Sequence, residues 1–197
     1  MAVDGEFPAT LDATKNAYQL VRLGVAETLT RVTPQDKLVP WLAREVSSVD
    51  PSTWRVMLRP NAKFWDGSPV TAQDVQAAFQ ADWAAYPAAA GLVSKDTQVK
   101  VVDATTLEFK TPQPLGNFAN AISAQFFVIH KNGMTMTGPY KPVNLAVGQE
   151  LTAEAFAEHW DGPPPVAKLS VRLVTDVNAR MLALRSGDVD FVYGVPP

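Results

Sequence analysis

The side chains best placed for chemistry in this sequence are two carboxylates, Asp188 and Asp190, in the stretch DVDFVYG. On a strand, residues two apart point to the same face, so these carboxyl groups would form a pair suited to general acid–base catalysis. Gly187 directly precedes them, and a helix end followed by a strand start explains the same residues more simply. We therefore expect no catalytic residue. A hydrolase built on the pair is the alternative, and Asp190→Asn would abolish its turnover.

The sequence has few side chains that could bind a metal ion and none that could act as a thiol. The chain has no cysteine and two histidines, His130 and His159. Disulfides, thiolate metal sites and thiol nucleophiles are excluded, and neither histidine has a second imidazole or an acidic pair at the spacing that a metal requires. We expect both histidines to be structural, and we expect neither a metal site nor a cofactor.

Composition narrows the class of partner. The 197 residues are 47% hydrophobic and 19% charged, with a net charge of -3 and no run of lysine or arginine. Because neither would be attracted electrostatically, we expect neither nucleic acid nor an anionic membrane surface as a partner. No apolar stretch reaches the ~18 residues that span a bilayer, and no basic-then-apolar leader precedes MAVDGEFPATLD. If the protein is exported, we expect its signal to be absent from this chain.

Local signals predict a mixed α and β protein. The strongest helix begins after Thr71, an N-cap with Asp74 three residues on, and it ends before Pro87. Hairpins are expected on either side of it, with turns at 50–52 and 103–105, because apolar and polar residues alternate around those turns. The remaining expected elements are a helix over 16–29, a buried strand over 126–130, strands over 149–156 and 167–176, a helix from Asp176 to Gly187, and a strand over 188–194.

The connector LRPNAKFWDGSPVTAQDV (58–75) joins the first hairpin to the strongest helix. Asp66 and Gly67 form a tight turn that tolerates positive φ, and the prolines set extended segments on both sides. Aromatic burial fixes a loop without a ligand, so Phe64 and Trp65 are expected to cover the core rather than to contact a solute.

Four ordered blocks resemble the bacterial extracellular solute-binding proteins, family 5, which serve peptide, dipeptide and nickel ABC importers. The blocks are DGEFPATLDA, KLVPWLAREVSSVDPSTWRVMLRPNAKFWDGSPVTAQDVQAAFQ, TGPYKPVNLAVGQELTAEAFAEHWDGPPPVAKLSVRLV and DVNARMLALRSGDVDFVYG. They resemble the family patterns "..E..TLDP", "L.P.LA" with "LR...KF.DG.P.TA.DV", "GTGPY...GQ...L..N..YW.G.P....V..R" and "D...R..AL.SGD.D". Because the blocks cover nearly the whole chain in order, the resemblance is far more specific than any single dipeptide.

The resemblance implies a fold with two α/β lobes of the type II periplasmic-binding-protein kind, joined by a hinge and closing on a ligand. This chain would be lobe I. Residues 1–25 and 131–197 would form its core subdomain and 26–130 an inserted subdomain of hairpins and helix, with the second lobe absent. The abrupt end at FVYGVPP likewise suggests a fragment. Apolar surface that the second lobe would cover then invites self-association.

The chain departs from the family pattern in two places. The connector over 131–137 is shorter than in relatives, and Met136 stands before Thr137 where the "GTGPY" motif has glycine. Nickel-type relatives use an arginine near Gln125 and Phe126 that this chain lacks, which disfavours a nickel chelate.

Ligand contacts are carried over by position only. The stretch after "TLD" matches a segment that lines the cleft in family members, and it contributes Lys15, Asn16 and Tyr18. Gln125 and Phe126 stand at a strand entrance that faces the same cleft, and Tyr193 lies just before the hinge. A solvated loop, a first helical turn and a core ring explain the same residues without any ligand.

The leading hypothesis is a binding module without enzymatic activity. It would capture oligopeptides or a similar small polar solute outside the membrane, as the first lobe of the substrate-binding component of an ABC importer, and deliver it to the permease. The location would be periplasmic or extracellular, with a lipid anchor left open. The alternative is a receptor-like lobe with a regulatory or scaffold role at the cell envelope, which the shortened connector favours.

Overall fold

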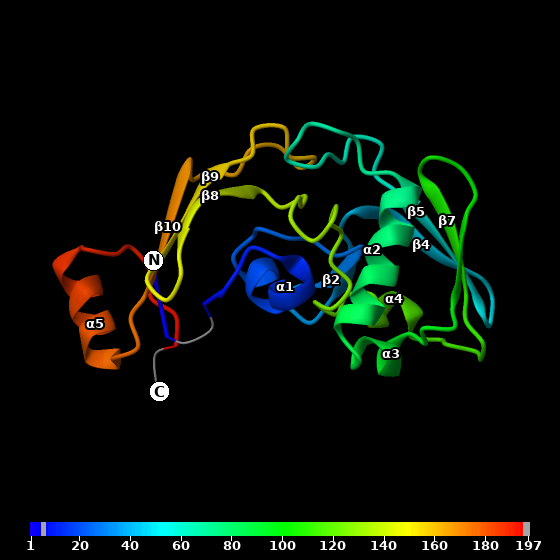
Figure 1. Cartoon of the computed structure of the whole chain (residues 1–197), viewed down its shortest axis with the longest axis horizontal. Helices are drawn as coiled ribbons and strands as arrows, with labels where there is room; N and C mark the ends of the chain where they lie inside the picture. The colour runs from blue at the N-terminus through cyan, green and yellow to red at the C-terminus, as the bar shows by residue number, and fades with distance from the viewer. Residues whose placement is uncertain (5–6, 195–197) are drawn as a thin grey trace.

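Two four-stranded sheets stand at opposite ends of an elongated molecule, with a helix between them (Figure 1). The computed structural model describes residues 1–4 and 7–194. The helices are α1 (Ala13–Arg22), α2 (Ala72–Ala85), α3 (Ala89–Leu92), α4 (Phe118–Ala121) and α5 (Val177–Ser186). The strands are β1 (Ala2–Val3), β2 (Thr30–Val32), β3 (Leu38–Pro40), β4 (Ala43–Asp50), β5 (Thr53–Leu58), β6 (Gln98–Val101), β7 (Thr106–Lys110), β8 (Tyr140–Ala146), β9 (Glu150–Ala155) and β10 (Lys168–Leu173).

The sheet β4-β5-β7-β6 is built from the two predicted hairpins. Their turns form where the sequence indicates, because an aspartate side chain accepts a backbone N–H two residues on in each. Asp50 Oδ1 accepts from Ser52 N at 2.8 Å, and Asp103 Oδ1 accepts from Thr105 N at 2.8 Å. Both hairpin predictions are confirmed.

Helix α2 packs beside this sheet and begins with the predicted capping box. The Thr71 side chain accepts from Asp74 N, and the Asp74 side chain accepts from Thr71 N at 2.9 Å. The helix buries Phe79, whose ring lies 5.0 Å from that of Phe109 and 4.9 Å from that of Phe127. These rings form the centre of the first buried cluster, which includes most of the apolar side chains between Leu29 and Ile129.

The second sheet, β1-β10-β9-β8, joins the two ends of the chain. β1 pairs with β10 in parallel, while β8, β9 and β10 form an antiparallel meander. Asp176 caps α5, and Gly187 ends it with φ 80°, both as predicted. The strand expected over 188–194 is wrong as a full element: only Val192 pairs, in an isolated parallel bridge to Ala2, because two-residue β1 leaves little edge to extend.

Two other predictions need correction. The helix expected over 16–29 is α1, which starts earlier under the Asp12 cap and stops before Gly24, whose φ of 69° ends a right-handed helix. The strand expected over 126–130 is buried from 127 to 130 but makes one isolated bridge, Val128 to Thr28, and joins no sheet. Its apolar run reports burial, which periodicity cannot distinguish from strand pairing.

A second buried cluster holds the sheet β1-β10-β9-β8 to α1. Its members are Val3, Ala13, Ala17, Leu20, Leu23, Val25, Ala26, Val128, Met136, Leu151 and Val171.

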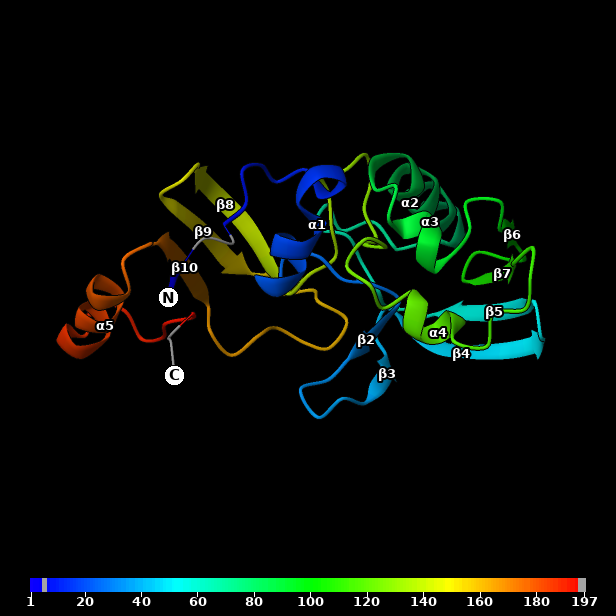
Figure 2. The same ribbon diagram turned by 90° about the horizontal axis from the view of Figure 1, so that it is seen from below.

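The proposed subdomain limits, 1–25 with 131–197 and 26–130, stay a prediction. Figure 2 shows α1 between the two ends of the molecule. In the described part of the chain, no helix combines the length and apolar character that a membrane crossing requires.

The segment TGPY fastens β8 to the exit of α1. Gly138 N donates to Val25 O at 3.2 Å, and Tyr140 N donates to Gly24 O at 3.0 Å. The indole of Trp65, from the 58–75 connector, donates to Gly138 O at 2.9 Å. A Cβ on Gly138 would lie 2.5 Å from the Gly24 carbonyl oxygen and closer still to the backbone of Val25. Only glycine permits this approach.

Phe64 is fully buried, as expected of a core-covering residue.

Gly138→Ala should therefore lower the free energy of unfolding by about 1–3 kcal/mol, the usual effect of overpacking, because two backbone segments would have to separate. Gly91→Ala is the matched control. Gly91 lies in α3, a Cβ added there would have no neighbour within 4 Å, and the substitution should change stability little or raise it. Urea unfolding followed by tryptophan fluorescence measures both. Equal stabilities for the two variants would contradict the close approach.

Candidate functional site

Helix α1 carries the candidate site, because two pockets open beside its C-terminal half. The first, named here the Gln125 pocket, has a volume of about 360 Å³ and is lined by Val21, Thr28, Arg31, Val32, Trp41, Ser123, Ala124 and Gln125. The second, the Tyr193 pocket, has a volume of about 320 Å³ and is lined by Met1, Val3, Arg22, Leu23, Phe191 and Tyr193. Consecutive residues of α1, Val21 and Arg22, thus face different pockets.

The Gln125 pocket combines a cation, an amide and an aromatic ring. The Arg31 guanidinium lies over the Trp41 ring, 5.0 Å from its centroid. The β2–β3 hairpin positions both residues, since Trp41 directly follows β3 and its N–H donates to Leu29 O at 2.9 Å. A guanidinium suits a carboxylate, and an indole face suits an apolar or planar group. The pocket can therefore hold a small polar solute.

The Tyr193 pocket is lined by one arginine, Arg22, which contacts Tyr193 in the lining and Tyr18 outside it. The Arg22 guanidinium lies 4.1 Å from the Tyr193 ring centroid and 5.3 Å from that of Tyr18. Arg22 Nη1 also donates to the Tyr18 hydroxyl at 3.2 Å. Both tyrosines are exposed, so their rings offer aromatic surface at the rim.

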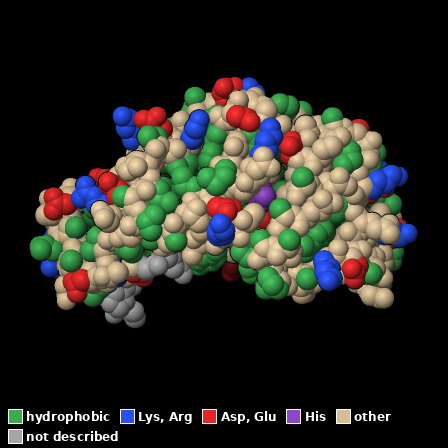
Figure 3. Space-filling model, viewed as in Figure 1, with side chains coloured by type: hydrophobic (Ala, Val, Ile, Leu, Met, Phe, Trp, Pro, Cys, Tyr) green, Lys and Arg blue, Asp and Glu red, His purple; other side chains and the backbone are tan. Residues whose placement is uncertain are grey.

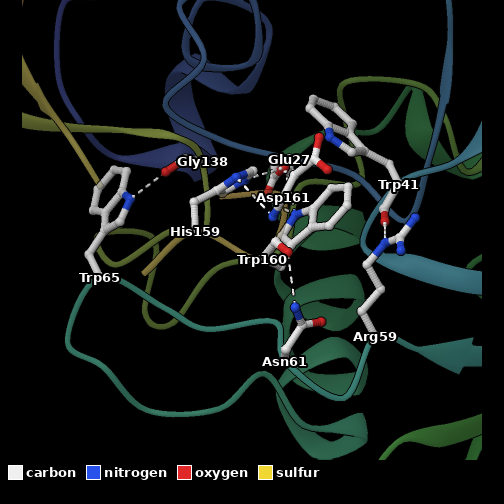
Figure 4. A network of polar contacts seen from close by, with 9 residues as sticks. All are labelled: Glu27, Trp41, Arg59, Asn61, Trp65, Gly138, His159, Trp160 and Asp161. Atoms are coloured by element: carbon white, nitrogen blue, oxygen red, sulfur yellow. Dashed lines mark hydrogen bonds and ion pairs between the residues drawn. The ribbon is translucent and has the colours of Figure 1, made fainter. Parts of the chain in front are cut away.

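A buried carboxylate, Glu27, directly precedes Thr28, which lines the Gln125 pocket. Glu27 is fully buried, and its Oε1 accepts from His159 Nε2 at 3.1 Å and from Trp160 Nε1 at 3.1 Å (Figure 4). The His159 Nδ1 accepts from Asp161 N at 3.4 Å, which leaves the proton on Nε2. Since a buried carboxylate requires hydrogen-bond donors, Glu27 fixes the loop after β9 against the chain that leaves α1.

Arg59 extends this network to the pocket. Its guanidinium stacks over the Trp160 ring at 4.0 Å, and its Nε donates to the Trp41 carbonyl oxygen at 2.6 Å. Asn61 Nδ2 donates to the Trp160 carbonyl oxygen at 2.9 Å. The 58–75 connector thus holds both the loop after β9 and the backbone of a pocket residue (Figure 4).

A second buried acid pairs with the other histidine. His130 Nε2 lies 3.3 Å from Asp82 Oδ1, and Gly133 N donates to His130 Nδ1 at 3.0 Å, so the imidazole proton is on Nε2. Burial raises the pKa of Asp82 to about 6, against the opposing effect of His130. Both imidazoles therefore contact one buried acid each. Within residues 1–4 and 7–194, no three His, Cys, Asp or Glu side chains are grouped to hold a metal ion.

The family model for bacterial extracellular solute-binding proteins, family 5 Middle, matches residues 37–197. The chain belongs to this family. The matched region includes three of the four blocks on which the sequence resemblance depends, and the first block, DGEFPATLDA, lies before it.

Curated relatives match most of this chain in sequence. It is 27% identical to the nickel-binding periplasmic protein of Escherichia coli (strain K12), over 86% of this chain and 36% of that protein. It is 27% identical to the periplasmic murein peptide-binding protein MppA of the same strain, over 96% of this chain and 42% of that protein. The chain spans about two fifths of the length of these curated relatives.

Solved structures show that the fold is shared. The crystal structure of a nickel ABC transporter from Bacillus halodurans superposes with a TM-score of 0.85 at 26% identity, covering 99% of this chain and 42% of that one. The Escherichia coli murein tripeptide binding protein MppA superposes with a TM-score of 0.84 at 22% identity, covering 99% and 45%. The predicted fold class, a mixed α/β lobe of the type II family, is confirmed.

The structure brings some of the sequence-predicted site residues of this family member together. Tyr18 and Tyr193 meet at Arg22, and Gln125 lines its own pocket. Lys15 is exposed and pairs with Asp12 at 3.2 Å. The other two are more enclosed: Asn16 is buried and accepts from Ala9 N at 3.2 Å, and Phe126 packs on Tyr86 with ring centroids 5.5 Å apart.

Sequence reasoning missed Arg31, Trp41 and Arg22. Trp41 belongs to the family block KLVPWLA, between the proline and the leucine. The sequence therefore marked the position of Trp41, but it did not predict that the ring lines a pocket. Arg31 belongs to a hairpin that no strong turn dipeptide announces, since the turn uses Asp36 with φ 55°. Arg22 follows Tyr18 by four residues, a spacing at which side chains on a helix meet.

His159→Phe should lower the free energy of unfolding by about 1–3 kcal/mol, because the buried Glu27 carboxylate loses one of its two side-chain donors. Glu158→Gln is the matched control next to it. It breaks an exposed ion pair with Lys63 and should change stability by less than about 1 kcal/mol. Chemical denaturation at neutral pH distinguishes them, and similar losses for both variants would contradict the assigned role of Glu27.

Asp82→Asn should change how stability depends on pH. The folded state holds the Asp82 proton more tightly than the unfolded chain, with a pKa of about 6 against 3.8, so this contribution is present at low pH and is lost as pH rises between those values. The stability of the wild type relative to Asp82→Asn should fall by about 2–3 kcal/mol from pH 4, close to the lower of the two pKa values, to pH 7, above the higher one. Asp96→Asn, at an exposed turn, serves as the control. If the difference in unfolding free energy between the wild type and Asp82→Asn stays constant with pH, burial does not raise the pKa of Asp82.

Proposed function

We propose that this chain is the first, N-terminal lobe of an ABC importer's substrate-binding component and that it captures oligopeptides or a similar small polar solute outside the membrane. The observation that carries the proposal is the pair of pockets on either side of α1 in a member of a solute-binding family. The names of two relatives, a nickel-binding periplasmic protein and a periplasmic murein peptide-binding protein, favour the same location for this chain.

The chemistry of the Gln125 pocket favours a peptide-like solute. A peptide offers a terminal carboxylate for Arg31, amide groups for Gln125 and an apolar side chain for Trp41. Sequence identity does not decide between a nickel chelate and a peptide as the ligand, because a relative named for nickel and a relative named for a peptide are both 27% identical to this chain. Among the described residues that line the pocket there is no histidine or carboxylate, so the lining offers a bare nickel ion no preferred side-chain ligand.

Binding without catalysis is part of the proposal. Asp188 and Asp190 are both exposed, and the Asp188 carboxylate accepts from Ser186 Oγ at 2.6 Å at the end of α5. This helix-terminal hydrogen bond gives Asp188 a local structural role. On the face in Figure 3, charges of both signs are scattered rather than gathered, which suits neither nucleic acid nor an anionic membrane.

Affinity should be low, because one lobe supplies only part of the contacts that two lobes closing on a ligand would make. We expect the tripeptide trialanine to bind with a dissociation constant on the order of a millimolar. In ¹⁵N–¹H spectra, the shifted amides should cluster at 18–32 and 123–126. Submicromolar binding in calorimetry would contradict the single-lobe proposal, and an absence of any shift would contradict a peptide ligand.

Arg31→Gln should weaken this binding about tenfold, since a charge-assisted hydrogen bond to the ligand carboxylate is lost. Arg185→Gln removes the same charge from α5, away from both pocket linings, and should leave the affinity unchanged. Equal effects of the two substitutions would indicate a general electrostatic attraction in place of a defined site.

A further inference from the structure

Helix α1 is broken in its first turn, between the candidate residues Lys15 and Tyr18. Asn16 has φ −137° and ψ 31°, outside the helical region, while the residues on both sides are helical. Asn16 is neither glycine nor proline, and no proline lies within α1. A break of this kind is expected where a side chain inserts into the hydrogen-bond ladder of a helix.

The inserted group is the hydroxyl of Tyr86. In a regular helix, Ala17 N–H would donate to the carbonyl oxygen of Ala13, four residues earlier. Here Ala17 N donates to the Tyr86 hydroxyl at 3.1 Å, and that hydroxyl donates to Ala13 O at 2.6 Å. One tyrosine oxygen therefore takes the place of a backbone hydrogen bond and satisfies both backbone groups.

Tyr86 is itself held by the other end of the molecule. It is the C-cap of α2, its N–H donates to Asp82 O at 2.8 Å, and its ring packs on Phe126. Burial raises the pKa of the Tyr86 hydroxyl above its ordinary value, so the hydroxyl keeps its proton and remains a donor at physiological pH. The ring contacts both buried clusters.

We infer that Tyr86 is a positioning residue: its hydroxyl holds the first turn of α1 in the broken form and so sets how Lys15 is presented relative to Tyr18. The inference rests on the proposed function, because Lys15 and Tyr18 belong to the candidate ligand-binding segment. Phe126 ties the same tyrosine to the neighbouring residue Gln125 and hence to the Gln125 pocket.

The geometry can be tested by carbon chemical shifts of the isotope-labelled 197-residue chain. In the wild type, the Cα and carbonyl shifts of Asn16 should be non-helical between helical neighbours. In Tyr86→Phe, Ala17 N–H can donate directly to Ala13 O, and the Asn16 shifts should move to helical values. Tyr140→Phe is the matched control, since the Tyr140 hydroxyl has no hydrogen bond within the described part of the chain, and it should leave Asn16 unchanged.

Two results would overturn the inference. Helical shifts running through Asn16 in the wild type would remove the break itself, and this measurement does not depend on whether Tyr86→Phe folds. Unchanged Asn16 shifts in a folded Tyr86→Phe would show that the hydroxyl does not hold the break.

Trialanine binding separates this inference from the proposed function. If both hold, Tyr86→Phe should bind trialanine about tenfold more weakly, while Tyr140→Phe stays within about twofold of the wild type. A wild type that does not respond to trialanine would defeat the proposed peptide function, and the Asn16 shifts would still decide the role of Tyr86. Unchanged affinity in a Tyr86→Phe that has lost the break would defeat the positioning role alone.

Discussion

The burial of the Glu27 carboxylate is the constraint on which the arrangement of this molecule depends. An ionised group can be removed from water only if donors replace its hydration, and the donors here, His159 and Trp160, stand 132 and 133 residues further along the chain. The loop after β9 must therefore return to the exit of α1. Arg59 and Asn61 join the 58–75 connector to the same point.

This junction explains how an elongated molecule keeps a defined site between its two ends. The Gln125 pocket takes residues from α1, the β2–β3 hairpin and the segment after α4, and none of these elements could hold a ligand alone. The hydroxyl of Thr30 donates to Ala119 O at 2.7 Å, which fixes the hairpin against α4. Pre-organised contacts of this kind reduce the entropy lost on binding, which supports the proposal that a single lobe presents an ordered part of the site.

Local signals in the sequence were enough to predict the elements that end on a cap or a turn. The capping box of Thr71 and Asp74, the left-handed Gly187 and both aspartate turns involve neighbouring residues. Predictions were wrong where a distant partner decides the outcome, as for 126–130, whose apolar run is buried without a sheet. The candidate site shows the same limit, because Gln125 and Tyr193 could be named by resemblance, whereas the insertion of Tyr86 into α1 depends on a contact 69 residues away.

The most direct test of the central claim is native-state hydrogen exchange at low urea concentrations, read at amides in both buried clusters. If the Glu27 junction joins the two ends into one unit, amides of β5 and β7 should share one opening free energy, and one urea dependence, with amides of β9 and β10. If β9 and β10 instead exchange through a separate opening of clearly lower free energy, the junction does not couple the two clusters, and the account is contradicted.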